Sequence, residues 1–365
     1  MKKSILISAL ALAALATTSC SNEETKAIEP QSNAIEFGTY LGRDAISRGS
    51  VADIGTVQTN GFGVFGYYTG SSNYANSTAA NFMFNQKVSY LSSAWSYTPV
   101  KYWPNNIGDK VTFLAYSPTT DDSHIDLPTG FSNTSTEDAK IKFTVDGTVG
   151  NQVDFLVADK QENQTKKATT GNVKFNFKHA LSRIGFTVEA MVDKVNDDAT
   201  GDTDDGSVTS DVIAAGTTIT IQSLELSTDF STNGVINLYT QAWTPATKSA
   251  TTYSWASADF ATTNVPTTKT DLNNTDKYLM ILPQDVTNLK FKVVYKVRTE
   301  DPALNGGYSE ITNTIEETVS SFTFAAGKAY TFNLHLGMTS VKFDAQVSGW
   351  DDTTPGTVVN LPINN

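Results

Sequence analysis

Apolar and polar residues alternate with a period of two along most of this chain. Clear runs of this pattern occur at residues 173–177, 184–190, 219–226, 291–297 and 330–336. Because successive side chains of a β-strand point to opposite faces, each run indicates a strand with one apolar and one polar face. No segment carries an amphipathic helix of three or more turns. The pattern therefore predicts an all-β protein of antiparallel sheets packed as β-sandwiches.

Polar segments without alternation indicate how the chain divides. Residues 159–171 are polar and lack an apolar period, so we expect a boundary there between an N-terminal sandwich of residues 49–168 and a C-terminal sandwich of residues 169–365. The stretch 193–216 is acidic, but its acids miss the spacing of an EF-hand loop. We interpret it as a solvated loop, with a looser calcium loop as the alternative.

The first twenty residues have the features of an export signal. Lys2 and Lys3 precede an apolar run at residues 5–16, which is too short to span a membrane as a helix. Small residues then lead directly to Cys20, the only cysteine of the chain. This arrangement resembles a bacterial lipobox, which implies that residues 1–19 are a lipoprotein signal peptide and that Cys20 carries the lipid.

The composition gives no starting point for a catalytic or metal site. With 26 basic and 38 acidic residues, the net charge is −12, which disfavours nucleic acid as a partner. No cysteine follows Cys20 to provide a zinc thiolate or a nucleophile. His124, His179 and His335 lack the spacing of paired metal ligands, and no Gly-x-Ser-x-Gly motif occurs. We therefore predict no catalytic residue, metal or cofactor, and structural roles for the histidines.

Two further patterns resemble ligand sites but are better explained by strands. Residues 61–66 match G-x-G-x-x-G, yet a strand pattern follows in place of the helix whose N-terminus would bind a pyrophosphate. Five tryptophans could form a carbohydrate-stacking platform, although we expect them to fill the sandwich cores. They are Trp95, Trp103, Trp243, Trp255 and Trp350.

The order and spacing of several short segments carry information about the protein family. They are GFGVFGY at 61–67, WSYTPVKYWP at 95–104, FLAYSP at 113–118, DFLVA at 154–158, FKHALSRI at 177–184, YLMILPQ at 278–284, AGKAY at 326–330 and VSGW at 347–350. Behind a lipobox, this series resembles the fimbrillin family, the type V pilus subunits of Bacteroidia. The resemblance covers most of the chain. It implies two tandem transthyretin-like β-sandwiches and a lipid-anchored precursor exposed on the cell outer membrane.

The resemblance also implies a role for the segment between the lipid and the first sandwich. Residues 20–48 would be a lipidated propeptide whose early strand completes the N-terminal sandwich. The inward residues of that strand are Ile35, Phe37 and Leu41. An arginine-specific protease would cut behind the strand, at Arg48 or Arg43, and remove lipid, tether and strand together. Arg48 is favoured because a glycine and a serine follow it; the alternative is that both arginines are ordinary loop charges.

The C-terminal tail is the segment that the resemblance implies as a replacement for this strand. Loss of the strand would leave an open edge that a strand of another subunit can cover. In the resembled family the donor is the tail, here about residues 356–365, in which Val359, Leu361 and Ile363 alternate at period two. Pro362 cannot donate to a ladder and would need an edge-facing position. A last strand paired within its own domain is the alternative.

The leading hypothesis is a structural subunit of a cell-surface pilus that polymerises by protease-triggered donor-strand exchange and supports adhesion. Its partners would be other copies of itself and related pilus subunits, an arginine-specific protease, outer-membrane lipid through Cys20, and a receptor on a host or bacterial surface. We expect no enzymatic activity. A pilus anchor or tip subunit, and a monomeric glycan-binding lipoprotein of the cell surface, are the alternatives.

Overall fold

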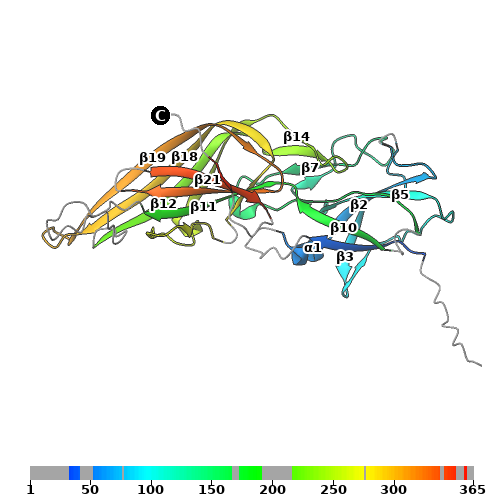
Figure 1. Cartoon of the computed structure of the whole chain (residues 1–365), viewed down its shortest axis with the longest axis horizontal. Coiled ribbons are helices and arrows are strands. Elements are labelled where there is room, and N and C mark those ends of the chain that lie inside the picture. The colour runs from blue at the N-terminus through cyan, green and yellow to red at the C-terminus, as the bar shows by residue number, and fades with distance from the viewer. Residues whose placement is uncertain are drawn as a thin grey trace, which may run out of the picture.

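The computed structural model describes residues 33–41, 52–75, 78–166, 172–190, 216–274, 277–337, 341–350 and 357–359. Strands and the turns between them make up most of these residues, which confirms the predicted all-β class. The molecule is elongated, and most strands run roughly along its long axis (Figure 1). Within the described residues, no helix is long and apolar enough to cross a membrane.

One half of the molecule contains two of the four sheets that the described strands form. The larger sheet has the order β1-β10-β8-β5-β2-β3-β4, with β9 beside β5. Its strands are β1 (Glu36–Leu41), β2 (Phe62–Gly70), β3 (Met83–Leu91), β4 (Ala94–Ser96), β5 (Lys110–Ser117), β8 (Leu156–Ala158), β9 (Gln161–Gln164) and β10 (Asn172–His179). The smaller has the order β14-β13-β7-β6. Its strands are β6 (Ile125–Asp126), β7 (Lys140–Thr144), β13 (Asn233–Asn237) and β14 (Trp243–Pro245).

The other half contains the remaining two sheets. One has the order β16-β11-β20-β21-β22, with β17 beside β11, and the other has the order β15-β12-β18-β19. The strands of the first are β11 (Ser182–Ala190), β16 (Thr270–Asp271), β17 (Leu279–Ile281), β20 (Lys328–Leu336), β21 (Val341–Gly349) and β22 (Thr357–Val359). Those of the second are β12 (Thr217–Phe230), β15 (Ser249–Ala256), β18 (Gln284–Glu300) and β19 (Tyr308–Phe324).

Strand direction departs from the sequence expectation at two places. Among the described strands, β1 runs parallel to β10 and β11 runs parallel to β20, whereas the other ladders are antiparallel, as in the long pairing of β18 with β19. A period of two is common to both kinds of ladder, so the alternation alone could not distinguish them.

Strand pairing crosses the division expected between residues 168 and 169. β10 follows that division and pairs with β8, while β13 pairs with β7. Within the polar stretch 159–171, residues 161–164 form β9, which pairs with β5, so this part of the stretch belongs to the larger sheet. The first half of the molecule therefore includes strands from beyond residue 168. The number of independent domains remains a prediction.

Both faces of the larger sheet are buried at its centre. In β5, Val111, Phe113 and Ala115 belong to one apolar cluster, while Leu114 and Tyr116 belong to another. The second cluster passes between this sheet and the smaller one, where it includes β7 and β13 side chains, and continues into the other half of the molecule. The first cluster is closed by β1 and by the short helix α1 (Ile54–Asn60). A strand that is buried on both faces reads as a continuous apolar run, as FLAY does here.

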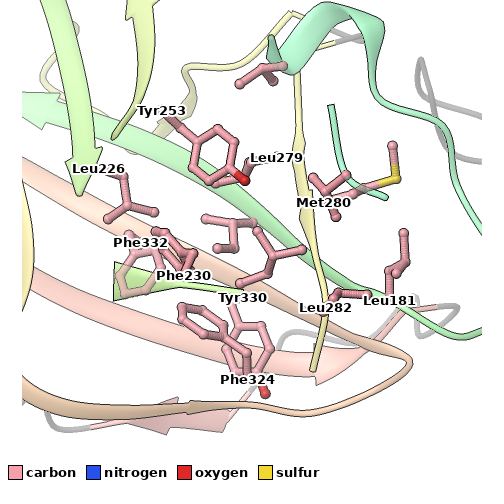
Figure 2. Close-up of a cluster of buried hydrophobic side chains, with 14 of the residues drawn as sticks. Leu181, Leu226, Phe230, Tyr253, Leu279, Met280, Leu282, Phe324, Tyr330 and Phe332 are labelled. Carbon is pink, nitrogen blue, oxygen red and sulfur yellow. The ribbon is translucent and has the colours of Figure 1, made fainter. Parts of the chain in front are cut away.

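The core of the second half lies between its two sheets. Phe291 of β18 meets Phe332 of β20 with ring centroids 4.8 Å apart, and Phe186 of β11 meets Trp255 of β15 at 5.0 Å. Figure 2 shows the apolar side chains gathered in this region, including Leu226 and Tyr253. Two single-turn 3-10 helices, η1 (Val149–Asn151) and η2 (Ser257–Asp259), lie in the connections.

The glycine-rich segment at residues 61–66 begins strand β2, as the sequence pattern predicts. Gly61 has a φ of 69° and ends helix α1 before the strand starts. A Cβ atom on Gly63 would lie 2.4 Å from the Tyr116 ring, so only glycine lets that ring pack on the strand. The motif therefore has a packing role in this fold.

Candidate functional site

Strand β1 is the first described element of the chain, and its inner face is buried in the larger sheet. It pairs with β10 over its whole length, from Glu36 beside Asn172 to Leu41 beside Phe177. Ile35, Phe37 and Leu41 are only 1%, 5% and 8% exposed. Figure 1 shows β1 running beside β10. The structure therefore places all three inward residues expected from the sequence inside one apolar cluster.

Phe37 lies at the centre of a group of aromatic rings. Its ring centroid is 5.6 Å from that of Phe175, in a stacked geometry, and 5.3 Å from that of Tyr97. Phe62 and Phe113 meet it edge-on at 6.2 and 5.8 Å. Such stacked and edge-on pairs are worth about 0.5–1.5 kcal/mol each beyond the area they bury. Phe37 is thus the main anchor of β1.

The start of β1 is also held on its other side. The Ile35 backbone N–H donates to the Lys101 carbonyl at 2.9 Å, and the Trp103 N–H donates to the Asn33 carbonyl at 2.8 Å. The Tyr97 hydroxyl donates to the Ile35 carbonyl at 2.8 Å. Burial raises the pKa of this phenol above its ordinary value of 10.0, so the hydroxyl stays a donor further into the alkaline range. We call residues 97–103 the latch segment, because it holds residues 33–35, directly before β1.

The chain that follows β1 has hydrogen bonds of its own to the rest of the fold. The Ala52 N–H donates to Asp154 Oδ2 at 3.0 Å, and His179 Nδ1 lies 2.7 Å from the same oxygen. The His179 ring stacks on Trp350 with centroids 4.4 Å apart and planes 3° apart. Asp53 then caps helix α1 by accepting the Thr56 N–H at 2.7 Å. Ala52 lies four residues beyond Arg48, so a cut at either predicted arginine would leave these contacts in place.

The described part of the C-terminal tail is paired within its own chain. Val359 of β22 lies opposite Ala345 of β21, and Thr357 lies opposite Val347, in an antiparallel ladder. This is the arrangement that the sequence left open as the alternative to a donor strand. Leu361 and Ile363 lie outside the described residues, as do Cys20, Arg43 and Arg48, so their predicted roles remain predictions.

The three histidines have carboxylate neighbours. His124 Nδ1 lies 2.7 Å from Asp122 Oδ1, and His179 contacts Asp154 as given above. His335 lies between Glu189 and Asp344 on the polar face of its sheet, at 2.6 and 2.7 Å. Within the described residues, no three His, Cys, Asp or Glu side chains are grouped so that they could hold a metal ion.

The latch segment is the part of the site that sequence reasoning missed. Its motif WSYTPVKYWP contributed to the family resemblance, but no function was assigned to it. The segment has no clean period of two and therefore gave no strand signal. Its contacts with residues 33–35 are the Tyr97 hydroxyl bond to Ile35 and isolated backbone pairings, such as the bridge between Ala34 and Tyr102. Only the folded structure could reveal them.

Known proteins resemble this chain in sequence and in fold. A family model described as fimbrillin-like matches residues 51–350.

The chain belongs to the fimbrillin-like family.

Two known proteins are similar to this fimbrillin-like chain over most of their length. It is 27% identical over 393 residues to the fimbrium subunit Fim1C of Phocaeicola vulgatus, a match that covers 96% of this chain and 97% of that protein. A crystal structure of a fimbrial protein from Bacteroides vulgatus aligns with a TM-score of 0.68 at 22% identity, covering 87% of this chain and 99% of the other. The family is one of fimbrial structural subunits and not of enzymes.

Proposed function

We propose that this fimbrillin-like chain is a structural subunit of a cell-surface fimbrium and supports adhesion. It reaches the surface as a lipoprotein precursor held in the outer membrane through Cys20. An arginine-specific protease cuts at Arg48 or Arg43, which frees β1 from the rest of the chain. A strand of a neighbouring subunit then takes the place of β1 and joins the two subunits. Membership of a family of fimbrial subunits supports the first statement. The lipobox-like pattern before Cys20 supports the second, and the geometry of β1 supports the strand exchange.

The observation that carries the mechanism is the position of β1 in the chain and in the core. β1 is buried along one face, and its covalent connection to the fold that follows is residues 42–51, which contain both arginines. The contacts of Ala52 and Asp53 hold the chain on the far side of these arginines. The family model also begins at residue 51, beyond β1. A cut in this short connection therefore separates β1 from the rest of the fold, whose first residues keep their hydrogen bonds.

The energetics explain why the vacated position must be refilled. Burying the side chains of Ile35, Phe37 and Leu41 contributes about 1.5–3 kcal/mol each, so roughly 5–9 kcal/mol in all. Removal of β1 also leaves N–H and C=O groups of β10 and of the latch segment unpaired, and an open apolar edge of this kind invites strand addition. An incoming strand recovers both contributions, less the cost of ordering it.

The five tryptophans on which the glycan-binding alternative depends do not form an exposed platform. All five tryptophans lie within the described residues, and none is exposed. Trp103, Trp255 and Trp350 are buried, while Trp95 and Trp243 are half-buried. A stacking platform for sugars requires exposed ring faces, so these residues act as core fillers.

Cleavage and uptake of a labelled strand test the mechanism directly. The chain with Cys20→Ser, purified without lipid, is treated with an arginine-specific protease and then mixed with a fluorescent peptide of residues 33–42. We expect the cut chain to take up the peptide, because the peptide restores the native contacts of β1. Uptake is measured by fluorescence anisotropy.

The matched control is the double variant Arg43→Lys/Arg48→Lys, which keeps both charges but resists the protease. We expect this variant to take up no peptide after the same treatment, because its own β1 remains attached. Equal uptake by both chains, or no uptake by the cut wild type, would show that the protease does not open the groove.

A further inference from the structure

The groove that β1 fills has one pocket of distinctive chemistry, the pocket of Phe37. Its walls are the rings of Phe62, Tyr97, Phe113 and Phe175, with the spacings given above. The neighbouring inward positions are less demanding, because Ile35 and Leu41 are aliphatic and Thr39 is half-buried. The strand that best fits this groove therefore has an aromatic residue at its second inward position.

The walls of this pocket hold one another in place. Phe62 lies 5.7 Å from Phe175 and 5.6 Å from Phe177, and Phe113 lies 6.1 Å from Trp103. Phe62, Phe113 and Phe175 are fully buried and come from three different strands. Departure of Phe37 consequently leaves a ring-sized cavity that these side chains cannot readily close. A smaller side chain in this pocket would leave part of that cavity empty.

The C-terminal tail of this chain has no residue that matches the pocket. Residues 351–365, DDTTPGTVVNLPINN, contain no aromatic residue. In a strand parallel to β10, Val359 or Leu361 would occupy the position of Phe37, depending on the register. Reversing the direction of the strand does not help, because the tail contains no aromatic residue.

The tail also has a place in its own chain. Thr357, Val358 and Val359 pair with β21 and extend the sheet of the second half by one strand. Donation of this segment to another subunit would uncover β21. Two independent observations, the aromatic pocket and the paired tail, thus argue against a second copy of this chain as the occupant.

We propose that the groove of β1 selects a strand of a different subunit, one with an aromatic residue at the Phe37 position, and discriminates against the tail of a second copy of this chain. This inference rests on the proposed strand exchange. It makes the chain a junction between unlike subunits, so that the purified chain alone does not form a continuous filament through this groove.

Competition between peptides measures this selectivity. The chain with Cys20→Ser is cut with the arginine-specific protease, and native mass spectrometry follows displacement of the cut β1 fragment. The competitors are the strand peptide (residues 33–42), its Phe37→Leu form, the tail peptide (residues 356–365) and the tail peptide with Leu361→Phe or Val359→Phe. We expect the strand peptide to displace the fragment at a concentration at least about tenfold lower than the native tail peptide, which corresponds to about 1.4 kcal/mol.

The substituted peptides identify the cause. Phe37→Leu should weaken the strand peptide, and one of the two phenylalanine substitutions should strengthen the tail peptide and so reveal its register. If the native tail displaces the fragment within threefold of the strand peptide, the selectivity is overturned while strand exchange stands. If no peptide displaces the fragment, strand exchange itself fails, and the selectivity is then decided in the uncut chain.

Substitutions in the uncut chain provide that second measurement, since β1 remains attached there. Phe37→Leu and Phe37→Val place in the pocket the side chains that Leu361 and Val359 of the tail would bring. Ile35→Val is the matched control at an aliphatic position. We expect the Phe37 variants to unfold at a clearly lower urea concentration than the control. Equal midpoints for all three would show that the pocket accepts aliphatic side chains and would overturn the inference.

Discussion

Asp154 joins three segments that are far apart in the sequence. Its Oδ2 atom accepts the Ala52 N–H and contacts His179 Nδ1, and the His179 ring in turn stacks on Trp350. The side chains of Asp154 and His179 are each only 1% exposed. In this buried position water cannot replace these partners. The carboxylate therefore holds together Ala52, the end of β10 at His179 and, through the ring of His179, Trp350 after β21.

We expect Asp154→Ala to lower the free energy of unfolding by about 3 kcal/mol or more, because it leaves the buried His179 and Ala52 donors without this acceptor. Urea unfolding measures the change. Asp159→Ala is the matched control: Asp159 pairs with Lys178 at the surface, where its side chain is 39% exposed, and such pairs contribute about 0–1 kcal/mol. Similar losses for the two variants would contradict the structural role of Asp154.

At the scale of single elements, β1 and β22 show what the sequence could and could not predict. The alternation of Ile35 and Phe37 indicated a strand with one inward face, because burial of that face is a local property of the chain. The choice of β10 as a parallel partner depends on residues more than 130 positions away and leaves no local mark. Val359 has the same alternation whether it pairs with β21 or with another subunit, so the pattern allowed both.

Removal of β1 should change backbone protection at two defined places. The Trp103 N–H loses its acceptor on Asn33, and β10 loses its parallel neighbour, whereas β2 and β5 keep their ladder. We expect faster hydrogen exchange in β10 and at Trp103 after the protease cut and release of β1, with β2 and β5 unchanged. Mass-spectrometric hydrogen exchange measures this, with Arg43→Lys/Arg48→Lys as the uncut control. Uniformly faster exchange would indicate global unfolding instead.

At the scale of the whole molecule, buried tyrosines set an alkaline limit on stability. Burial is the main cause that raises the pKa of Tyr67 and Tyr116 in one half, and it raises the pKa of Tyr253 in the other half to about 12. The unfolded chain releases these protons near the ordinary value of 10.0, while the folded chain keeps them. Their contribution is therefore complete below about pH 10 and is lost as the pH rises toward the folded pKa.

We expect the free energy of unfolding to fall between about pH 10 and pH 12, by about 1.4 kcal/mol per pH unit for each tyrosine that stays protonated in the fold. Urea unfolding at about pH 9 and about pH 11 measures the slope. Tyr253→Phe removes one such group and should make the slope shallower. An identical slope in this variant would mean that Tyr253 ionises without unfolding.

The arrangement of the whole chain was only partly predictable. The fold class follows from alternation that is repeated in many segments, and errors in single segments do not change it. The pairing of β7 with β13, which joins residues 140–144 to residues 233–237, is set by long-range packing of Ile141 and Ile236 in one core. A polar stretch such as 159–171 looks the same whether it separates domains or connects strands within a sheet.

The orientation of the strands along the long axis has a mechanical consequence. Hydrogen bonds in a ladder such as that of β18 and β19 lie perpendicular to the strands. Tension applied to the two ends of the molecule would pull along the strands (Figure 1), and so would shear many of these bonds together instead of opening them one after another. A filament made of such units would transmit tension from its tip to the cell with little stretching.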